Sequence, residues 1–415
     1  MASGSSRSYT GEIDAPDRRV LGALVLVRVS LRCCMRSRPR PASLPAPVVS
    51  VPRPISILHV DAERGFSGGE VQVLHLLEGL RTRGHANLLA CPPGSKVEAV
   101  ARQRGFETRA VAMRGDLDLA AVANLRRVCE ERGPDLVHLH TGRATWLGGL
   151  AARWAERPAI TTRRMDRRVK RNWRTRLIYE HLVRRAVAIA PAVARCLTDA
   201  GVRDVVTIPS AVDPDALTDA RPRDEVRAGL DVPREARLAL VLAALVRRKG
   251  LDVLLRAFER LDVPGALLWI AGEGPERERL EEQARASGSG SRVRFLGRRE
   301  DKAALLAAAD VVCLPSRQEG LGVAALEAMA VGRPVVASRV GGLGEAVVHG
   351  RTGLLVEPED EEGLAAALQR LLGSPEEAQR LGAEGPGRVA EGFRVDQMVA
   401  SYEDLYRELL AGSKP

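Results

Sequence analysis

The stretch Pro315–Pro334, PSRQEGLGVAALEAMAVGRP, decides the fold. It follows an apolar run, Ala309–Leu314, whose length and composition predict a buried strand. Its own second half, from Val323 to Met329, consists of helix-forming residues. The stretch therefore predicts a strand, a loop and a helix in succession, with Glu319 in the loop and Glu327 in the helix.

The loop of this unit has the composition of an anion site. Gly320 and Gly322 let the backbone approach a ligand closely, and the helix that follows offers unpaired N–H groups to an anion. Glu319 and Glu327 could bind sugar hydroxyls from the same segment. The alternative is that two glutamates at this spacing are only a helix surface. The predicted ligand contacts in this segment are Glu319, Gly320, Leu321, Gly322, Val323 and Glu327.

The wider pattern resembles a known family. After the two glutamates come Ala-Met-Ala at 328–330, Gly-Arg-Pro-Val-Val-Ala at 332–337 and a glycine pair at 341–342. This order resembles the donor site of retaining family-4 glycosyltransferases (glycosyltransferases group 1), which have the GT-B fold, and the likeness extends from about Ile55 to the C-terminus. The resemblance implies that Glu319 contacts sugar hydroxyls, the loop amides the sugar and phosphate, and Glu327 the ribose.

Apolar runs alternate with helical patterns along most of the chain. This alternation predicts the α/β class, with two Rossmann-like doubly wound parallel-sheet domains, and ligands beyond the carboxyl ends of the strands. The GT-B resemblance implies that the two domains face a cleft. We expect strands near 55–60, 86–90, 108–111, 136–139, 159–162, 187–190 and 205–208, and then near 238–245, 266–271, 293–296, 311–314, 334–337 and 354–356.

The composition divides the chain into four parts. Residues 1–50 are expected to be a disordered basic tail, with a mis-assigned start codon or a weak membrane tether as alternatives. Residues 51–212 are expected to form the N-terminal, acceptor-side domain and 213–392 the nucleotide-sugar donor domain, joined by a linker rich in Pro and Asp at 209–223. We expect residues 393–415 to form a C-terminal helix that packs back on the first domain.

The net charge of +10 is unevenly distributed. Residues 1–50 carry 8 basic and 3 acidic residues, 51–212 carry 27 and 16, and 213–415 carry 28 and 34. A basic first half favours an anionic partner, such as a phosphorylated or lipid-linked acceptor, a membrane surface or a nucleic acid. Nucleic acid is disfavoured because Trp173 is the one aromatic residue within the most basic run, at 163–176.

Cysteine usage and hydropathy bear on the compartment. The six cysteines show no metal-binding or disulfide spacing, which is typical of a reducing cytoplasm. The apolar run at 20–27 is too short to cross a bilayer and lacks the pattern of a signal peptide. We expect a cytoplasmic protein, or one bound peripherally to the inner face of the membrane.

The segment AALVRRKG, 243–250, gathers cations between a strand and a helix. The resemblance implies that Lys249 holds the donor diphosphate. The family places an arginine where this chain has Ala244, so Arg247 or Arg248 would have to supply that charge. We assign Arg248 and Lys249 to the donor site, and a solvated basic turn is the alternative.

No metal or cofactor is expected. Cations and fixed amides can stabilise a diphosphate leaving group without a metal. The two Asp-x-Asp pairs, at 116–118 and 213–215, have the context of turns and helix caps. Gly272 and Gly274 suggest a dinucleotide fingerprint, but Arg277 occupies its third glycine position. The expected co-substrate is a nucleotide diphosphate sugar.

The first domain contributes a glycine pair and two histidines. Gly68 and Gly69 precede a helix expected at 70–83, and the resemblance places them near the donor phosphate, although a plain tight turn explains them nearly as well. His138 and His140 lie two apart at a strand end and so share one face. In the family, a histidine at the position of His140 lies over the donor sugar. A hydrogen-bonded structural histidine is the alternative.

A run of arginines follows the strand at 159–162. Because it begins at the carboxyl end of a strand, we expect anion recognition, with Arg163 and Arg164 binding the acceptor. Solvated charge is the alternative. The segment VVTIPSAVDP, 205–214, resembles the family's crossing between domains, with Ser210 and Ala211 in place of the usual Asn and Gly.

Together these features predict a retaining, metal-independent glycosyltransferase. Glu319, Lys249 and His140 are its expected catalytic residues, and its acceptor is expected to be an anionic glycan, lipid-linked or on the cell surface, as in lipopolysaccharide or glycolipid biosynthesis. Two alternatives stay open. One is a degenerate homologue that binds nucleotide sugar or glycan without turnover, and the other is a nucleotide-sugar epimerase of similar fold. The sequence does not identify the base, the sugar or the oligomeric state.

Overall fold

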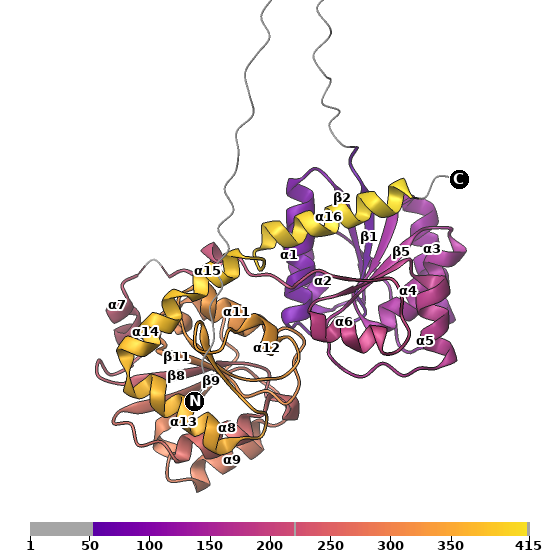
Figure 1. Cartoon of the computed structure of the whole chain (residues 1–415). Helices are drawn as coiled ribbons and strands as arrows, with labels where there is room; N and C mark the ends of the chain where they lie inside the picture. Colours follow the sequence, from indigo (N-terminus) through magenta and orange to yellow (C-terminus); the bar gives the residue numbers. More distant parts are fainter. Residues whose placement is uncertain (1–52, 220, 413–415) are drawn as a thin grey trace, which may run out of the picture. The chain divides into compact units, whose positions relative to one another are not determined.

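Two parallel sheets organise the computed structural model, which describes residues 53–219 and 221–412 (Figure 1). The first sheet has seven strands in the order β3-β2-β1-β4-β5-β6-β7, and the second has six in the order β10-β9-β8-β11-β12-β13. The predicted class, two Rossmann-like doubly wound parallel sheets, is confirmed. The predicted tail at 1–50 lies outside the described residues, and the domain boundaries stay predictions.

The first sheet is built from short, buried strands with helices between them. Its strands are β1 Ser56–Val60, β2 Ala86–Cys91, β3 Glu107–Ala110, β4 Leu136–Leu139, β5 Ala159–Arg163, β6 Arg185–Ala188 and β7 Val205–Thr207. Its helices are α1 Gly68–Thr82, α2 Lys96–Gln103, α3 Leu119–Arg132, α4 Gly142–Trp154, α5 Trp173–Leu177 and α6 Pro191–Thr198, with a π-helical turn at Ile178–Leu182.

The second sheet repeats this organisation. Its strands are β8 Arg237–Leu242, β9 Ala266–Ala271, β10 Val293–Gly297, β11 Val311–Leu314, β12 Val335–Ser338 and β13 Gly353–Val356. Its helices are α7 Arg223–Gly229, α8 Leu251–Glu259, α9 Arg277–Ala286, α10 Lys302–Ala308, α11 Val323–Ala330, α12 Leu343–Ala346, α13 Glu361–Gly373, α14 Pro375–Ala383 and α15 Gly385–Ala390. Short 3₁₀ turns lie at Asp215–Leu217, Arg247–Lys249 and Gly290–Arg292.

The last helix, α16 (Val395–Ala411), packs on the first sheet rather than the second. Its buried Val399 and Tyr406 share a cluster with Ile57 and Leu76, and it contacts α1. At Gly79 of α1, a β-carbon would lie 2.4 Å from a methyl group of Val399, so glycine is what permits this close helix pair. The C-terminal segment therefore contributes to the core of the N-terminal sheet.

Each sheet has one point where the strand order reverses, and loops that follow the flanking strands meet there. In the first sheet this point lies between β1 and β4, with Leu58 beside Val137. In the second it lies between β8 and β11, with Ala239 beside Val311. The loops after these four strands carry most of the predicted site residues.

Several elements differ from their predicted bounds. The strand expected at 238–245 is β8, which ends at Leu242. Helix α1 begins at Gly68 because Ser67 caps it in a capping box with Glu70, so the glycine pair lies in the first turn of the helix rather than ahead of it. Strand β6 ends at Ala188 because Pro191 starts α6.

Within the described residues, none of the helices combines the length and the hydropathy that a membrane crossing requires.

Candidate active site

The reversal point of the second sheet joins two predicted site residues. The loop after β8 presents Lys249 and the loop after β11 presents Glu319, and the lysine ammonium pairs with the glutamate carboxylate. Ser316 also donates to this carboxylate, at 3.3 Å. Both charged side chains are mostly buried, with 15% and 12% exposed. A buried cation and anion are therefore held in contact at the edge where a ligand would bind.

The glycines of the loop after β11 are required by close packing. A β-carbon on Gly320 would lie 2.1 Å from the carbonyl oxygen of Arg164, and one on Gly322 would lie 2.3 Å from Leu343. Gly322 also has φ +83°, which favours glycine, and it precedes the first turn of α11. Gly341 packs closely against the same loop, since a β-carbon added at this position would lie 1.9 Å from the Glu319 carbonyl oxygen.

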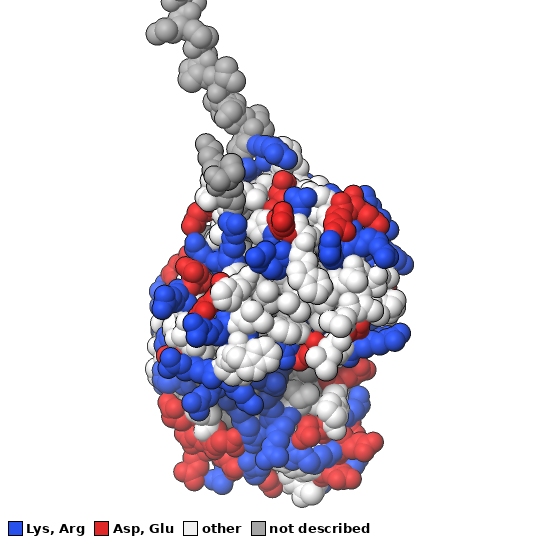
Figure 2. All heavy atoms as spheres, turned by 90° about the vertical axis from the view of Figure 1, so that its right-hand side faces the viewer, with Lys and Arg blue, Asp and Glu red and all other residues white. Residues whose placement is uncertain are grey.

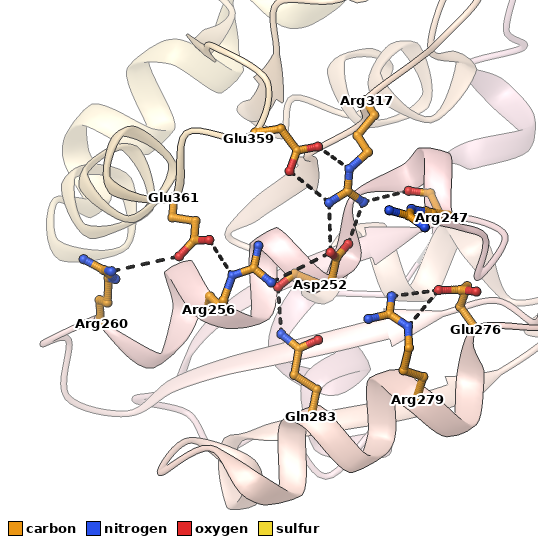
Figure 3. Close-up of polar contacts among 10 residues, drawn as sticks. All are labelled: Arg247, Asp252, Arg256, Arg260, Glu276, Arg279, Gln283, Arg317, Glu359 and Glu361. Carbon is orange, nitrogen blue, oxygen red and sulfur yellow. Dashed lines mark hydrogen bonds and ion pairs between the residues drawn. The ribbon is translucent and has the colours of Figure 1, made fainter.

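Arg317 fixes this loop to the helix after β8 (Figure 3). Its guanidinium donates to both carboxylate oxygens of Asp252, at 2.7 and 2.8 Å, to Glu359 at 2.9 Å and to the Arg247 carbonyl at 2.8 Å. The hydrogen bonds to Asp252 and then to Glu359 raise the pKa of Arg317, and the bond from Arg317 lowers the pKa of Asp252. This network was not predicted from the sequence, and it positions Glu319, which lies two residues from Arg317.

The network continues along α8 away from the loop. Figure 3 shows Arg256 between Asp252 and Glu361, and Gln283 of α9 donates to the Asp252 carbonyl at 2.8 Å. The loop after β11 is thus tied to α8, and α8 to α9 and to the start of α13. A donor site built on these loops would have a rigid support.

Glu327 lies in the second turn of α11 and is 8% exposed. Lys302, at the start of α10, donates to its carboxylate at 2.8 Å. The alternative of a solvated helix-surface acid does not fit this burial. A ligand hydroxyl could replace the lysine, whose side chain is 44% exposed.

At the reversal point of the first sheet, His140 takes part in a chain of hydrogen bonds. Arg164 donates to its carbonyl at 3.0 Å and lies 3.3 Å from its Nδ1. The His140 Nε2 is 3.0 Å from Nδ1 of His59, whose Nε2 is 3.1 Å from the side-chain oxygen of Asn87. Because a guanidinium can only donate, Nδ1 of His140 accepts from Arg164 and the proton of His140 lies on Nε2. This proton is donated to Nδ1 of His59, so His59 carries its own proton on Nε2 and donates it to Asn87.

The neighbouring His138 lies on the same face, as predicted, with its ring 4.0 Å from that of His140. It bonds at 2.7 Å to the hydroxyls of Tyr406 in α16 and Thr162 in β5. Burial lowers the pKa of His59 to about 4 and holds the pKa values of His138 and His140 well below 6.5. All three imidazoles are therefore neutral near pH 7.

The two predicted acceptor residues differ in their surroundings. Arg164 touches His140 and lies against the loop that carries Gly320, so it joins the two reversal points. Arg163 instead donates to the Arg167 carbonyl at 2.5 Å. Only Arg164 is in direct contact with other predicted site residues. Gly69 is also near it, since a β-carbon there would lie 3.5 Å from the Arg164 side chain, whereas Gly68 faces open space.

Two family models match this chain over most of its length. The model for glycosyl transferases group 1 matches residues 222–388, and the model for glycosyltransferase family 4 matches residues 66–216. The chain belongs to this family of glycosyltransferases. The resemblance inferred from the stretch around Glu319 is thereby confirmed.

Curated relatives and solved structures agree with this assignment. A Rhizobium meliloti lipopolysaccharide core biosynthesis glycosyltransferase, LpsD, is 34% identical over 234 residues, which cover 55% of this chain and 66% of LpsD. A Mycobacterium tuberculosis glycogen synthase is 37% identical over 179 residues, covering 42% of this chain and 43% of the relative. The glycosyltransferase thus spans about half the length of the curated relatives it matches.

The fold likeness covers more of the chain. The structure of Anabaena Alr3699/HepE in complex with UDP and glucose matches with a TM-score of 0.77 and 22% identity, covering 85% of this chain and all of that one. At this identity the likeness shows the shared fold.

Two arginines lie close in the chain to Ala244, the position at which the resemblance implies an arginine. Ala244 is exposed, and of the two arginines that could replace the missing charge, Arg247 points to solvent. Arg248 is half-buried, and among the described residues its Nη1 is a buried atom without a hydrogen-bond partner. A buried guanidinium nitrogen left unpaired is expected to gain a partner on ligand binding. Arg248 therefore fits the missing charge better than Arg247.

Two acidic residues that were not predicted from the sequence lie close to the predicted site residues. Asp166, within the arginine run, accepts a hydrogen bond from the Glu319 backbone, and burial raises its pKa. Asp61, directly after β1, is 1% exposed and accepts from the Glu63 amide at 2.8 Å. Burial raises the pKa of Asp61 to about 7. Both follow parallel strands at their carboxyl ends, which is the signal that could have identified them.

The remaining acid pairs and the histidine cluster bear on metal binding. Asp118 caps α3 and Asp213 accepts from the Asp215 amide, as expected of caps and turns.

His59, His138 and His140 bring one nitrogen each within 4.8 Å of one another, a spacing that could hold a metal ion. However, every ring nitrogen of the three already has a hydrogen-bond partner, so a metal would have to displace those bonds. The donor set fits a hydrogen-bonded network better than a metal centre.

Replacing Asp61 by Asn should change how the stability of the protein depends on pH. The unfolded chain ionises Asp61 near 3.8, whereas the folded state keeps it protonated up to about 7, so wild type loses stability as pH rises through this range. The Asn variant lacks this loss. Its unfolding free energy relative to wild type should therefore rise between about pH 4 and 8, by at most a few kcal/mol. Denaturant titrations at several pH values measure the difference, and a constant difference would contradict the buried neutral carboxyl.

Proposed function

We propose that this glycosyltransferase moves a sugar from a nucleotide diphosphate sugar to an anionic glycan acceptor, lipid-linked or on the cell surface, with retention of anomeric configuration and without a metal ion. The observation that carries the proposal is the Lys249–Glu319 pair, with the unpaired Arg248 nitrogen, at the reversal point of the second sheet. This is where an open α/β sheet binds its ligand. The bound UDP of HepE and the lipopolysaccharide role in the name of LpsD support the donor and acceptor classes.

In the proposed reaction, Lys249 and Arg248 stabilise the leaving diphosphate. The bond between the anomeric carbon and the diphosphate oxygen breaks, and its electron pair goes to the nucleoside diphosphate. The acceptor hydroxyl attacks the same face of the sugar and gives its proton to the departing phosphate. Glu319 accepts hydrogen bonds from the donor sugar, Glu327 from the ribose, and neutral His140 donates from Nε2 to the sugar once His59 is displaced from that bond.

The acceptor is proposed to be held by Arg164, which already contacts His140 and lies beside the loop that carries Glu319. A guanidinium binds phosphate or carboxylate with two parallel hydrogen bonds. The proposed site of action is the inner face of a membrane, where a lipid-linked acceptor would be available.

Product analysis tests the reaction. The protein is incubated with UDP-, GDP-, ADP- and CDP-sugars and a phosphorylated or lipid-linked glycan acceptor, with and without EDTA. The proposal predicts a new glycoside whose anomeric configuration matches that of the donor, at a rate that EDTA does not lower. An inverted anomer would contradict retention, and loss of activity with EDTA that returns with added metal would contradict metal independence.

One observation favours a second candidate, a binder of nucleotide sugars without turnover. Ala244 occupies the position at which the family has an arginine, and Arg248 approaches the site from a different position in the loop. In that case donor binding is seen but no glycoside forms, and Ala244→Arg restores turnover. An isomerised free nucleotide sugar as the product would instead indicate an epimerase.

A further inference from the structure

The first domain carries an unusual exposed apolar surface. Four large hydrophobic side chains are exposed in the described part of the chain: Leu117 at 91%, Leu119 at 70%, Trp154 at 53% and Trp173 at 71%. All four belong to the N-terminal sheet and its helices. The protein has four tryptophans, and two of them, Trp154 and Trp173, are exposed to solvent. Exposed apolar patches of this kind mark interaction sites.

The loop before α3 holds its leucines outward. The amide of Arg114 donates to the Asp118 carboxylate at 3.0 Å, and the Asp118 amide donates to the Gly115 carbonyl at 3.3 Å. The indole of Trp146 donates to the Asp116 carbonyl at 2.7 Å. These bonds fix the backbone on both sides of Leu117, so its exposure is built into the fold.

Helices α4 and α5 extend the same surface. Trp146, Leu150 and Trp154 recur every four residues and therefore share one face of α4. Trp173 packs edge-on against Trp146, with ring centroids 6.4 Å apart. Arg174 joins the loop to these helices, because it pairs with Asp116 at 2.6 Å and lies 4.6 Å from the centre of the Trp146 ring. We call Leu117, Leu119, Trp146, Leu150, Trp154 and Trp173 the α4 patch.

Exposed arginines lie close to Trp154 and Trp173 in the sequence. Arg153, Arg168 and Arg171 are exposed and form no ion pair within residues 53–219 and 221–412. An open cavity of about 1530 Å³ begins beside Trp154 and Trp173, at Arg153 and Arg171, and is lined by seven arginines and four acidic residues. Figure 2 shows this side of the molecule as a pale area with blue basic groups around it. A cationic cavity next to exposed tryptophans is complementary to anionic headgroups above acyl chains.

We infer that the α4 patch docks this protein on an anionic phospholipid surface. The tryptophans and leucines enter the interfacial layer, while the surrounding arginines bind lipid phosphates. The α4 patch runs along α4, from the loop after β3 that carries Leu117 to Trp154, which ends α4 ahead of the amino end of β5. The arginine-lined cavity lies at that amino edge of the sheet, because residues that directly precede β5, β6 and β7 line it. Docking would place the protein on the membrane that holds a lipid-linked acceptor. In this respect the inference rests on the proposed function, whereas vesicle binding itself needs no turnover.

Co-sedimentation of the full-length protein with vesicles tests the surface. Wild type should bind vesicles of phosphatidylcholine with about 30% phosphatidylglycerol and lose binding as salt is raised. The double variant Leu117→Ser/Trp173→Ser should bind at least about tenfold more weakly, because two apolar side chains no longer enter the membrane. Arg168→Glu/Arg171→Glu should reduce binding to the anionic vesicles specifically.

Matched controls separate the patch from general effects. Arg285→Glu/Arg298→Glu changes two exposed arginines of the second domain by the same charge; neither forms an ion pair in the part of the chain that the structure describes. This variant should bind like wild type if the α4 patch is the contact. Thermal shifts with nucleotides should be unaltered in every variant, so that failure of the docking surface is distinguished from failure of the donor site. Wild-type binding by the leucine–tryptophan variant, or no binding by wild type, overturns the inference. So does a concentration-dependent dimer that these substitutions dissociate, because a second copy would then cover the patch.

Discussion

Lys249→Ala and Glu319→Ala should each lower kcat/KM for sugar transfer by about 100-fold to 1000-fold. The lysine is proposed to stabilise the charge that develops on the leaving diphosphate, and losing one such preorganised donor typically has an effect of this size. The glutamate is proposed to orient the sugar through its hydroxyls. Initial rates over a range of donor concentrations measure the change.

The two exposed residues Glu282 and Arg285 of α9 provide matched controls. They carry the same types of charge, and neither forms an ion pair within the described residues, so Glu282→Ala and Arg285→Ala should keep wild-type rates. Melting temperatures are needed for both site variants, because each leaves its former partner buried and unpaired. If both site variants transfer sugar at near wild-type rates, the assignment of the donor site is wrong.

Asp310→Ala should destabilise the second domain by about 3–5 kcal/mol, because it leaves buried cations without their counter-charge. The Asp310 carboxylate accepts from Arg223 at 2.5 Å, from Arg227 at 3.3 Å and from the Leu238 amide at 2.7 Å. Arg227 is only 5% exposed. Burial, together with the charge of Arg223, lowers the pKa of the nearby Arg333 to about 10, and the charge of Asp310 partly offsets this lowering. Denaturant unfolding measures the loss.

Asp301 is the control for this substitution. It forms a 2.6 Å pair with Arg299, and both side chains are more than a third exposed. Asp301→Ala should therefore change the unfolding free energy by no more than about 1 kcal/mol. Equal effects of the two substitutions would show that Asp310 does not neutralise a buried cluster.

The sequence was sufficient for the fold because the signals were local. Buried parallel strands are short apolar runs, as at 311–314 and 266–271, and the structure has strands with these bounds. The strand at 187–190 was placed two residues too late, because Ile189 and Ala190 continue the apolar run although the strand has already ended. Apolar composition alone does not show where a strand gives way to a helix cap.

The site was only partly predictable, because several of its contacts join distant segments. Glu319 and Lys249 were found from glycine-rich and basic loops, yet their pairing depends on the order of β8 and β11 in the sheet. The hydrogen bonds from Arg317 to Asp252 and to Glu359 join residues that are 65 and 42 positions apart in the sequence. No pattern near Arg317 in the sequence indicates these bonds. The same applies to His59, whose bond to His140 spans 81 residues.

Thermal stability with nucleotides tests the central claim, a metal-free nucleotide-sugar site around Lys249, Glu319 and Glu327, most directly. UDP, GDP, ADP and CDP are added alone and as sugar conjugates, with and without EDTA. A ligand at about 100 times its dissociation constant stabilises the folded state by roughly 2.7 kcal/mol. We expect a shift with one nucleotide family that EDTA does not alter and that Lys249→Ala removes. No shift with any nucleotide, in a folded sample, would contradict the account.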